Sequence, residues 1–445
     1  MRTFAATLVL GCLALAVRPD RAAAQPAPCA PVYGEAGCNP GFGGCATGYC
    51  DGYCDGHCGD PRMWGSGEFL LGFRKSRQVP ALVTTSPPGT SQIDAGVLGL
   101  PSTTTLFGGD GLEDSPQPGV RGEIGFWLDP RAQIGVGGSF TGLGKESVAF
   151  SASSDGSTIL ARPFFNTLLD QQASQLVAFP GLVRGSVGVQ SENQVYAAEV
   201  FLRQQIGLWP GQTPVLLLAD SLAMRISSLF RLPCAQVSIP ENQAFPGASW
   251  TRLDFIAGYQ FSRVDDSLSI TNNLVSLDPA FLGQIGTTLD AFDRFDTRND
   301  FHGGALGLRT VSHYGRWSLA MLGKVALGNM RQTVTIDGGT VITVPSGPSV
   351  ATLGGLLSQS SNIGDFAQDR FAVIPEARIM LNYDLTPRLS VGVGYDFLYW
   401  NRVALAGDQV DTRVDVTQTL PNPSFSFREG DYFVQAVTFL VQLNH

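Results

Sequence analysis

Residues 369–401 read DRFAVIPEARIMLNYDLTPRLSVGVGYDFLYWN, and their side chains alternate in polarity with a period of two. Every second residue from Phe371 to Tyr383 is apolar or aromatic, whereas the residues between them include Glu376 and Arg378. The alternation resumes after a short turn. Because successive side chains of a strand point to opposite faces, this stretch predicts an antiparallel hairpin with one apolar face and one mixed, partly charged face.

The length of this hairpin indicates where it lies. Each strand is expected to run for about 12 residues, against roughly 5–6 residues in the sheets of soluble proteins. A tilted strand needs about 9–11 residues to cross a bilayer, and its lipid side must be apolar. The hairpin therefore predicts two membrane-crossing strands. The alternative is a long hairpin of a soluble β-sandwich, whose apolar face would meet a second sheet.

The composition fits a sheet that does not show all of its outer face to water. The chain has 445 residues, of which 15% are charged, and it contains 53 glycines and 27 phenylalanines. Soluble proteins carry about 25% charged residues. A net charge of −9 argues against nucleic acid as a partner, because nucleic-acid binding needs clustered lysine and arginine.

The first 24 residues have the pattern of a Sec-type signal peptide. Arg2 precedes an apolar run that ends at Val17, and three alanines at 22–24 provide small residues before a cleavage point. The apolar run is too short to span a membrane as a helix. We therefore expect an exported chain whose mature part begins near residue 25.

Residues 25–62 form a separate, cysteine-rich segment. Its six cysteines are Cys29, Cys38, Cys45, Cys50, Cys54 and Cys58. In an exported chain this density predicts disulfide bonds, although the sequence leaves their pairing open. A metal site that includes His57 is the alternative. The spacing around His57 matches neither the usual zinc pattern nor a haem attachment, so no metal or other cofactor is expected.

The region 63–445 repeats the pattern of the opening hairpin. Tight turns near 129, 313 and 386 alternate with long loops rich in Gly, Pro and Ser, expected at about 74–118, 144–188, 270–298, 338–368 and 402–430. This asymmetry is typical of outer-membrane barrels. The sequence predicts an all-β fold, a transmembrane antiparallel up-and-down β-barrel of about 10–12 strands with long extracellular loops. The higher number applies if 206–249 adds a hairpin. That region could instead be a plug-like insertion.

The charges within the expected strands all fall on the mixed face, which would line the lumen of a barrel. These pore-lining candidates are Arg121, Glu123, Glu199, Arg203, Arg252, Asp254, Arg309, Lys324, Glu376, Arg378 and Asp396. Opposed charges across a narrow lumen can tune the passage of ions. Alternatively, they pair with one another and close the lumen, as inner side chains fill small barrels.

Eight segments of the chain resemble segments of a known family, both in their sequence and in their order along the chain. They are LVTTSPPGT (82–90), AGVLG (95–99), TLFGG (105–109), RPFFN (162–166), DSLSI (266–270), KVALGNMRQTVTIDG (324–338), NIGDFAQDRFAVIPE (362–376) and FLYWNRV (397–403). The resemblance is to the group of outer-membrane β-barrel porins numbered seven, and it covers about 63–445. It implies an outer-membrane location and a porin-like assignment.

We therefore expect a porin-like passive channel for small solutes or ions in the cell outer membrane. The alternatives are a non-conducting structural or surface-interaction barrel and a soluble secreted β-sandwich adhesin. No enzyme activity is expected, because none of the four histidines of the chain has a serine or aspartate at a spacing that would indicate a catalytic pair. The expected partners are outer-membrane lipid, small solutes or ions, and an envelope component for the cysteine-rich segment. The oligomeric state is left open.

Overall fold

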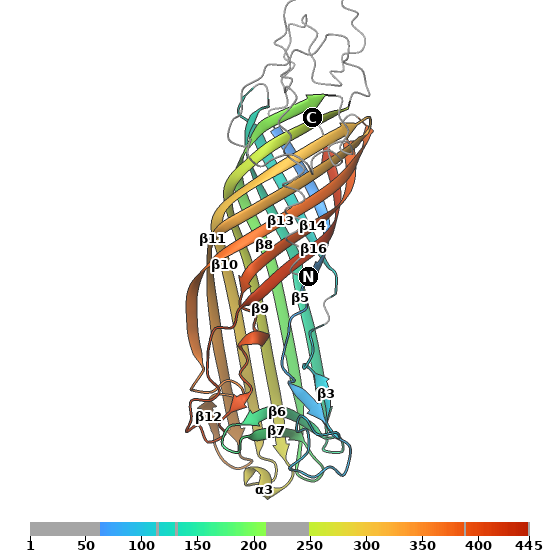
Figure 1. Ribbon diagram of the computed structural model, residues 1–445. Coiled ribbons are helices and arrows are strands. Elements are labelled where there is room, and N and C mark those ends of the chain that lie inside the picture. Colours follow the sequence, from blue (N-terminus) through green and yellow to red (C-terminus); the bar gives the residue numbers. More distant parts are fainter. Residues whose placement is uncertain (1–62, 113–114, 130–131, 211–248, 387–388, 444–445) are drawn as a thin grey trace, which may run out of the picture.

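Ten antiparallel strands close into a barrel in the computed structural model, which describes residues 63–112, 115–129, 132–210, 249–386 and 389–443 (Figure 1). The main sheet has eleven strands in the order β10-β9-β8-β5-β4-β1-β16-β14-β13-β11-β12, and the pairing of β10 with β11 closes the ring without β12. Neighbours in the ring follow the order of the chain. The predicted up-and-down barrel is confirmed. Among the described residues it has ten ring strands, the lower of the two predicted numbers.

The ring strands are β1 (Met63–Arg74), β4 (Gln117–Trp127), β5 (Ile134–Ser154), β8 (Val183–Pro210), β9 (Trp250–Ser276), β10 (Thr288–Tyr314), β11 (Trp317–Thr343), β13 (Gly364–Thr386), β14 (Leu389–Val403) and β16 (Gly430–Leu443). The short strand β12 (Ser349–Leu353) pairs with the far end of β11.

The tight turns gather at one end of the barrel, here called the turn end. Tyr314 pairs directly with Trp317 across the turn between β10 and β11, and Thr386 pairs with Leu389 between β13 and β14. The amide of Leu128 donates to the carbonyl of Ile134 (2.8 Å) across the turn between β4 and β5. The opposite end carries the long connections that the structure describes and is called the loop end. Strand β8 ends and β9 begins at the turn end, where Pro210 pairs with Trp250. The predicted alternation of short and long connections is therefore present.

The outward face of the half nearer the turn end is apolar, as the alternation predicts. Phe371 is 66% exposed, Val200 is 63% exposed and Leu306 is 52% exposed. Other members of this apolar belt are Phe69, Val120, Ile124, Phe140, Leu202, Tyr259, Leu327, Ile379, Leu381, Val393, Tyr395, Phe439 and Val441. A continuous belt of exposed apolar side chains around a closed barrel is the surface that lipid covers.

Among the described residues, no helix is long and apolar enough to cross a membrane.

The wall is much taller on one side than on the other. The neighbouring strands β4, β1, β16 and β14 have 11, 12, 14 and 15 residues, whereas the other six ring strands have between 21 and 28. The long strands therefore continue beyond the apolar belt as an incomplete cylinder, visible as upright strands in the lower half of Figure 1.

Each long strand reverses its polarity where it leaves the belt. Near the turn end of β9, the outward side chain of Phe255 is exposed and the inward Asp254 is buried. Farther along the same strand, the inward Leu268 and Ile270 are fully buried, while the outward face carries Ser269. Buried inward residues of the neighbouring strands include Val187 and Val189 in β8, Phe295 in β10, and Val334 and Ile336 in β11. The wall thus turns apolar residues to lipid in one half and to its own interior in the other.

A second, smaller sheet fills the interior at the loop end. It consists of β15 (Arg413–Val414), β6 (Leu160–Asn166), β2 (Val83–Thr85) and β3 (Thr104–Phe107), and β7 (Gln171–Ala178) pairs with β6. Leu82, Ile159, Val177 and Val414 of this region pack in one cluster with the inward apolar residues of the wall. Strands β6 and β7 cross the lower end of the barrel in Figure 1. We call this sheet and its connections the loop-end plug.

The plug corrects the predicted loop boundaries. The segments 144–188, 270–298 and 338–368 were expected to be long loops, but large parts of them are strands of the wall or the plug. The expectation was wrong because the apolar residues change from the outward to the inward face beyond the belt. The alternation that marks a lipid-facing strand therefore ends there, although the strand itself continues.

Several expectations fall on residues that the structure does not describe. These are the signal segment 1–24, the cysteine-rich segment 25–62 with its six cysteines, and most of 206–249. Residues 206–210 belong to the end of β8, and β9 begins at Trp250.

Candidate functional site

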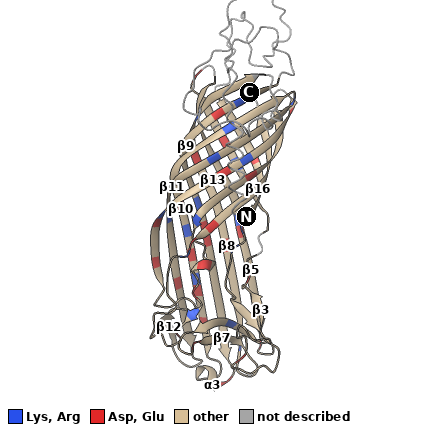
Figure 2. Ribbon diagram, viewed as in Figure 1, with Lys and Arg blue, Asp and Glu red and all other residues tan. Residues whose placement is uncertain are grey.

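All eleven predicted pore-lining residues lie on the inward face of the barrel, in the half that the apolar belt surrounds. Figure 2 shows where charged residues lie along the strands of the wall. Nine of them line one cavity of about 320 Å³, namely Arg121, Glu123, Glu199, Arg203, Arg252, Arg309, Lys324, Glu376 and Arg378. The other two, Asp254 and Asp396, are buried beside it and pair with its arginines. The structure therefore brings the predicted residues together around a single space.

The alternation in β1 adds Glu68, which the sequence interpretation did not select. Glu68 is 8% exposed and accepts from Arg378 Nη2 at 2.7 Å, and its Oε2 lies 3.4 Å from Arg121 Nη1. Its position opposite the lipid-facing Phe69 was a sufficient signal. We call the twelve residues the lumen charge cluster. The cluster has six cationic and six anionic members, and Asp384 lines the same cavity.

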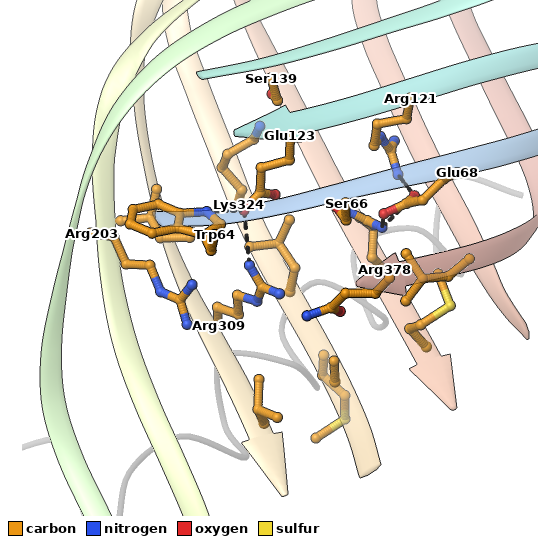
Figure 3. A pocket seen from close by; sticks show the side chains of 18 of the residues that line it. Trp64, Ser66, Glu68, Arg121, Glu123, Ser139, Arg203, Arg309, Lys324 and Arg378 are labelled. Atoms are coloured by element: carbon orange, nitrogen blue, oxygen red, sulfur yellow. Dashed lines mark hydrogen bonds and ion pairs between the residues drawn. The ribbon is translucent and has the colours of Figure 1, made fainter. Parts of the chain in front are cut away.

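Ion pairs of the cluster reach across the lumen (Figure 3). Arg378 of β13 contacts Glu68 of β1, although two strands of the ring separate them. Arg121 of β4 contacts Asp396 of β14 at 2.9 Å, and Arg378 Nε lies 2.9 Å from the same carboxylate. The guanidinium groups of Arg121 and Arg378 thus share the carboxylates of Glu68 and Asp396. These four side chains occupy space in the middle of the barrel that an open pore would need.

Lys324 holds the second part of this network. Its ammonium lies 2.6 Å from Glu199 and 2.7 Å from Glu376, and its side chain is 6% exposed. Glu376 also faces Arg121 Nη2 at 3.9 Å. Removing charges from water is costly unless each finds a partner with good geometry, so these residues depend on one another.

A separate network lies nearer the turn end. Asp254 accepts from Arg203 Nε at 2.7 Å and from Arg252 Nε at 2.6 Å. The ring of Trp127 lies 5.0 Å from the guanidinium carbon of Arg203 and 4.6 Å from that of Arg252. Contacts of this kind orient both guanidinium groups and stabilise their charge.

Arg309 and Glu123 complete the turn-end part of the cavity. Arg309 Nη1 lies 3.2 Å from Glu123 Oε1, and the indole of Trp64 donates to the same oxygen at 3.0 Å. The Arg309 side chain is 30% exposed, the largest exposed fraction in the lumen charge cluster. This guanidinium is the part of the cluster that faces the cavity most openly.

Two large aromatic side chains lie in the lumen between the charge cluster and the loop-end plug. Trp400 and Tyr432 are both 0% exposed, with ring centroids 5.9 Å apart. The Trp400 indole donates to the Ser262 hydroxyl at 2.9 Å, and the Tyr432 hydroxyl donates to Asn193 Oδ1 at 2.8 Å. Both bonds end on the opposite wall, since three ring strands separate their partners by the shorter route. We call this pair the aromatic bar.

Further buried ion pairs lie inside the barrel toward the loop end. Arg77, just beyond β1, is 2% exposed and donates to Asp266 Oδ1 and to the Ser191 hydroxyl, each at 2.8 Å. Arg74 donates to Glu146 Oε2 at 3.4 Å. The Arg77 contacts fix the segment that follows β1 to the inner wall, and the Arg74 contact joins β1 to β5.

The plug is also anchored at its far side. Arg162 of β6 is fully buried and pairs with Asp293 of β10 at 2.5 Å. The other oxygen of Asp293 accepts from the amides of Leu357 and Ser358, each at 2.8 Å, and from the Ser358 hydroxyl. One carboxylate therefore ties β6, the wall and the connection after β12 together.

No group of three or more His, Cys, Asp or Glu side chains in the described part of the chain is arranged to hold a metal ion. His302 lies on the outward face with its Nδ1 2.5 Å from the Tyr259 hydroxyl, and His313 stacks on Trp250 with ring centroids 4.2 Å apart. Trp250 and His313 both line the cavity described above.

Comparison with solved structures finds outer-membrane barrels at low similarity. The outer membrane protease OmpT from Escherichia coli has 11% identity and a TM-score of 0.36, covering 87% of this chain and 98% of its own. The P. putida toluene transporter TodX has 10% identity and a TM-score of 0.20, covering 86% and 90%. A comparison with curated proteins found no match. The family model "Putative beta barrel porin-7 (BBP7)" matches residues 64–445, and the chain therefore belongs to this porin-like family of outer-membrane β-barrels.

Proposed function

We propose that this protein is an outer-membrane barrel with a closed lumen, which acts as a structural or surface-interaction element rather than as an open pore. The aromatic bar carries this proposal. Trp400 and Tyr432 are fully buried and hydrogen-bond to the opposite wall, whereas the interior of a conducting porin is a water-filled polar channel.

The regions on either side of the bar support the same conclusion. The lumen charge cluster has equal numbers of cations and anions, and its ion pairs reach across the barrel. The plug fills the loop end with an apolar core that includes Leu82, Ile159 and Phe295. Such a plug would present a rigid surface outside the cell.

A porin-like passive channel for small solutes or ions is the second candidate. The family description and the cavity of about 320 Å³ lined by charged groups favour it. In this form Trp400 and Tyr432 would leave the lumen and the plug would move, and the charges of the cluster would then set ion selectivity.

Planar-bilayer recordings of the refolded protein separate the two candidates. A general porin reconstituted in the same bilayer serves as the control for insertion. We expect no stepwise conductance over repeated insertions of this protein. Reproducible channel steps would overturn the closed-barrel proposal and favour the passive channel.

Export to the outer membrane is part of the proposal. The basic start, apolar run and alanines of 1–24 favour cleavage by a signal peptidase, and the apolar belt favours lipid as the surrounding medium. We further propose that the cysteines of 25–62 form disulfides and that this segment contacts an envelope component. N-terminal sequencing of the mature chain should begin near Gln25. Alkylation of the denatured chain before reduction should label only Cys234, and alkylation after reduction should also label the six cysteines of 25–62.

A further inference from the structure

Two buried oxygen atoms on neighbouring strands have no hydrogen-bond donor among the described residues. They are Glu199 Oε1 of β8 and Gln260 Oε1 of β9. The two residues are directly opposite in the register of their strands, and both line the cavity. Directly opposed residues have their Cβ atoms about 4.5–5.5 Å apart. Glu199 is 9% exposed and Gln260 is 2% exposed, so neither oxygen is satisfied by bulk water.

A third oxygen-bearing side chain lies at the same level. Ser139 of β5 is directly opposite Glu199 on the other side of β8, and it also lines the cavity. We call Ser139, Glu199 and Gln260 the oxygen row. The second oxygen of Glu199 accepts from Lys324 Nζ at 2.6 Å, which holds the carboxylate in place. Buried acceptors without a donor are costly, so the row favours an occupant.

The charges around the oxygen row favour a cation. One part of the lumen charge cluster, joined by ion pairs, has three positive and four negative groups. These are Arg121, Lys324 and Arg378 with Glu68, Glu199, Glu376 and Asp396. The rest of the cluster has three groups of each sign once Asp384 is counted with it. These are Arg203, Arg252 and Arg309 with Glu123, Asp254 and Asp384.

The described groups in and beside the cavity therefore carry one excess negative charge when His313 is neutral. This excess lies in the part that contains Glu199. A water molecule would donate to both unpaired oxygens but would leave the excess charge in place. A single positive ion would satisfy the oxygens and cancel the charge together.

We propose that the oxygen row binds one monovalent metal cation, sodium or potassium, inside the lumen. Oxygen atoms replace the hydration shell of such cations in selective binding sites. The row contains one carboxylate, whereas sites for divalent calcium collect several, and a second positive charge would lie close to the Lys324 ammonium. The cation would connect β5, β8 and β9 through their side chains. It does not require the barrel to conduct, so it is independent of the closed-lumen proposal.

The test is equilibrium dialysis of the full-length protein in neutral detergent micelles against radioactive sodium or rubidium, with rubidium as the probe for potassium. Chloride of N-methylglucamine, a cation too large for the row, holds the ionic strength constant and suppresses binding to the outer surface. We expect one sodium or rubidium ion per protein. Binding of neither ion would overturn the proposal and would leave the two oxygens to water or to a proton on Glu199.

Two variants locate the site. Gln260→Met removes one oxygen with little change in volume and none in charge, and should weaken binding by roughly tenfold. Ser139→Ala takes away only a hydroxyl and guards against a folding defect of the first variant; it should also weaken binding. Gln194→Met is the matched control, because Gln194 is exposed on the outward face of β8.

Heat-modifiable gel migration verifies that each variant is folded. Equal binding by the wild type, Gln260→Met and Ser139→Ala would overturn the proposal, as would equal weakening by the variants at 194 and 260.

Discussion

The indole of Trp400 donates a 2.9 Å hydrogen bond to the hydroxyl of Ser262, on the opposite wall of the barrel. Trp400 belongs to β14 and Ser262 to β9, so the bond spans the lumen. A tryptophan in the middle of a barrel with a satisfied N–H group combines a large buried apolar area with a fixed orientation. This contact is the main observation behind the proposed closed lumen.

Replacing Trp400 should therefore destabilise the barrel strongly. Trp400→Ala leaves a cavity among buried neighbours, and we expect a loss of about 3–5 kcal/mol in the free energy of unfolding, measured by urea titration in lipid vesicles. Trp317→Ala is the control, because Trp317 is 50% exposed at the turn end and should cost much less. Equal losses would contradict the role of the aromatic bar.

Neutralising Lys324 alone should lower the free energy of unfolding more than neutralising Lys324 together with Glu199 and Glu376. Lys324→Met leaves Glu199 and Glu376 buried without their shared partner, which should cost about 3–5 kcal/mol of unfolding free energy. The triple variant with both glutamates changed to glutamine should recover most of that loss. Urea titration measures both. A triple variant as unstable as the single one would refute this dependence.

Removing the Asp293 carboxylate should release the plug without opening the membrane part of the barrel. Asp293→Ala deprives Arg162, Leu357 and Ser358 of their shared acceptor. We expect faster proteolysis between 344 and 363, detected by mass spectrometry, with unchanged heat-modifiable migration. Asp296→Ala is the control, because Asp296 lies outward on the same strand and pairs with the exposed Arg294. Its cleavage pattern should match that of the wild type.

The loop around Asp415 should loosen in acid. Burial alone would raise the pKa of Asp415, but hydrogen bonds from the Leu420 and Thr417 amides and from the Thr417 and Thr419 hydroxyls outweigh it and lower the pKa below its usual 3.8. Stabilisation by a carboxylate with a lowered pKa is present above that usual value and is lost as the pH falls toward the folded value. We expect faster hydrogen exchange at 415–422 as the pH falls below about 4, after correction for the intrinsic rate.

Asp415→Asn provides the control for this loop. The amide keeps one acceptor oxygen but cannot be protonated in this range, so corrected exchange at 415–422 should no longer depend on pH below about 4. A pH dependence that persists in the variant would assign the transition to another group.

A charge in the apolar belt should destabilise the barrel, whereas the same charge beyond the belt should not. Ile379→Arg places a guanidinium on the outward face of β13, where Ile379 is 46% exposed, and should cost about 2–4 kcal/mol in vesicles. Ala367→Arg is the control, since Ala367 is exposed on the same face of β13 nearer the loop end. Equal tolerance of both changes would argue against lipid around Ile379.

The inward direction of the charged residues of the candidate site could be predicted from a single physical rule. A charge cannot face lipid, so Arg121, Lys324, Glu376 and every other charge in the expected strands had to point inward, and the structure has them there. Glu68 obeys the same rule and could have been added. The partners of these charges could not be predicted, because Arg378 and Glu68 are 310 residues apart and meet only when the ring closes.

The sequence by itself determined the closed antiparallel barrel, the apolar belt and the inward side of each charge, because period-two alternation and lipid exclusion act on each strand separately. Tertiary structure alone decided which inward side chains meet across the lumen. Trp400, Tyr432, Arg77 and Arg162 give no local signal of crossing the interior. Whether an inward side chain lines a pore or closes it depends on what stands on the opposite wall, and closure of the ring sets that distance.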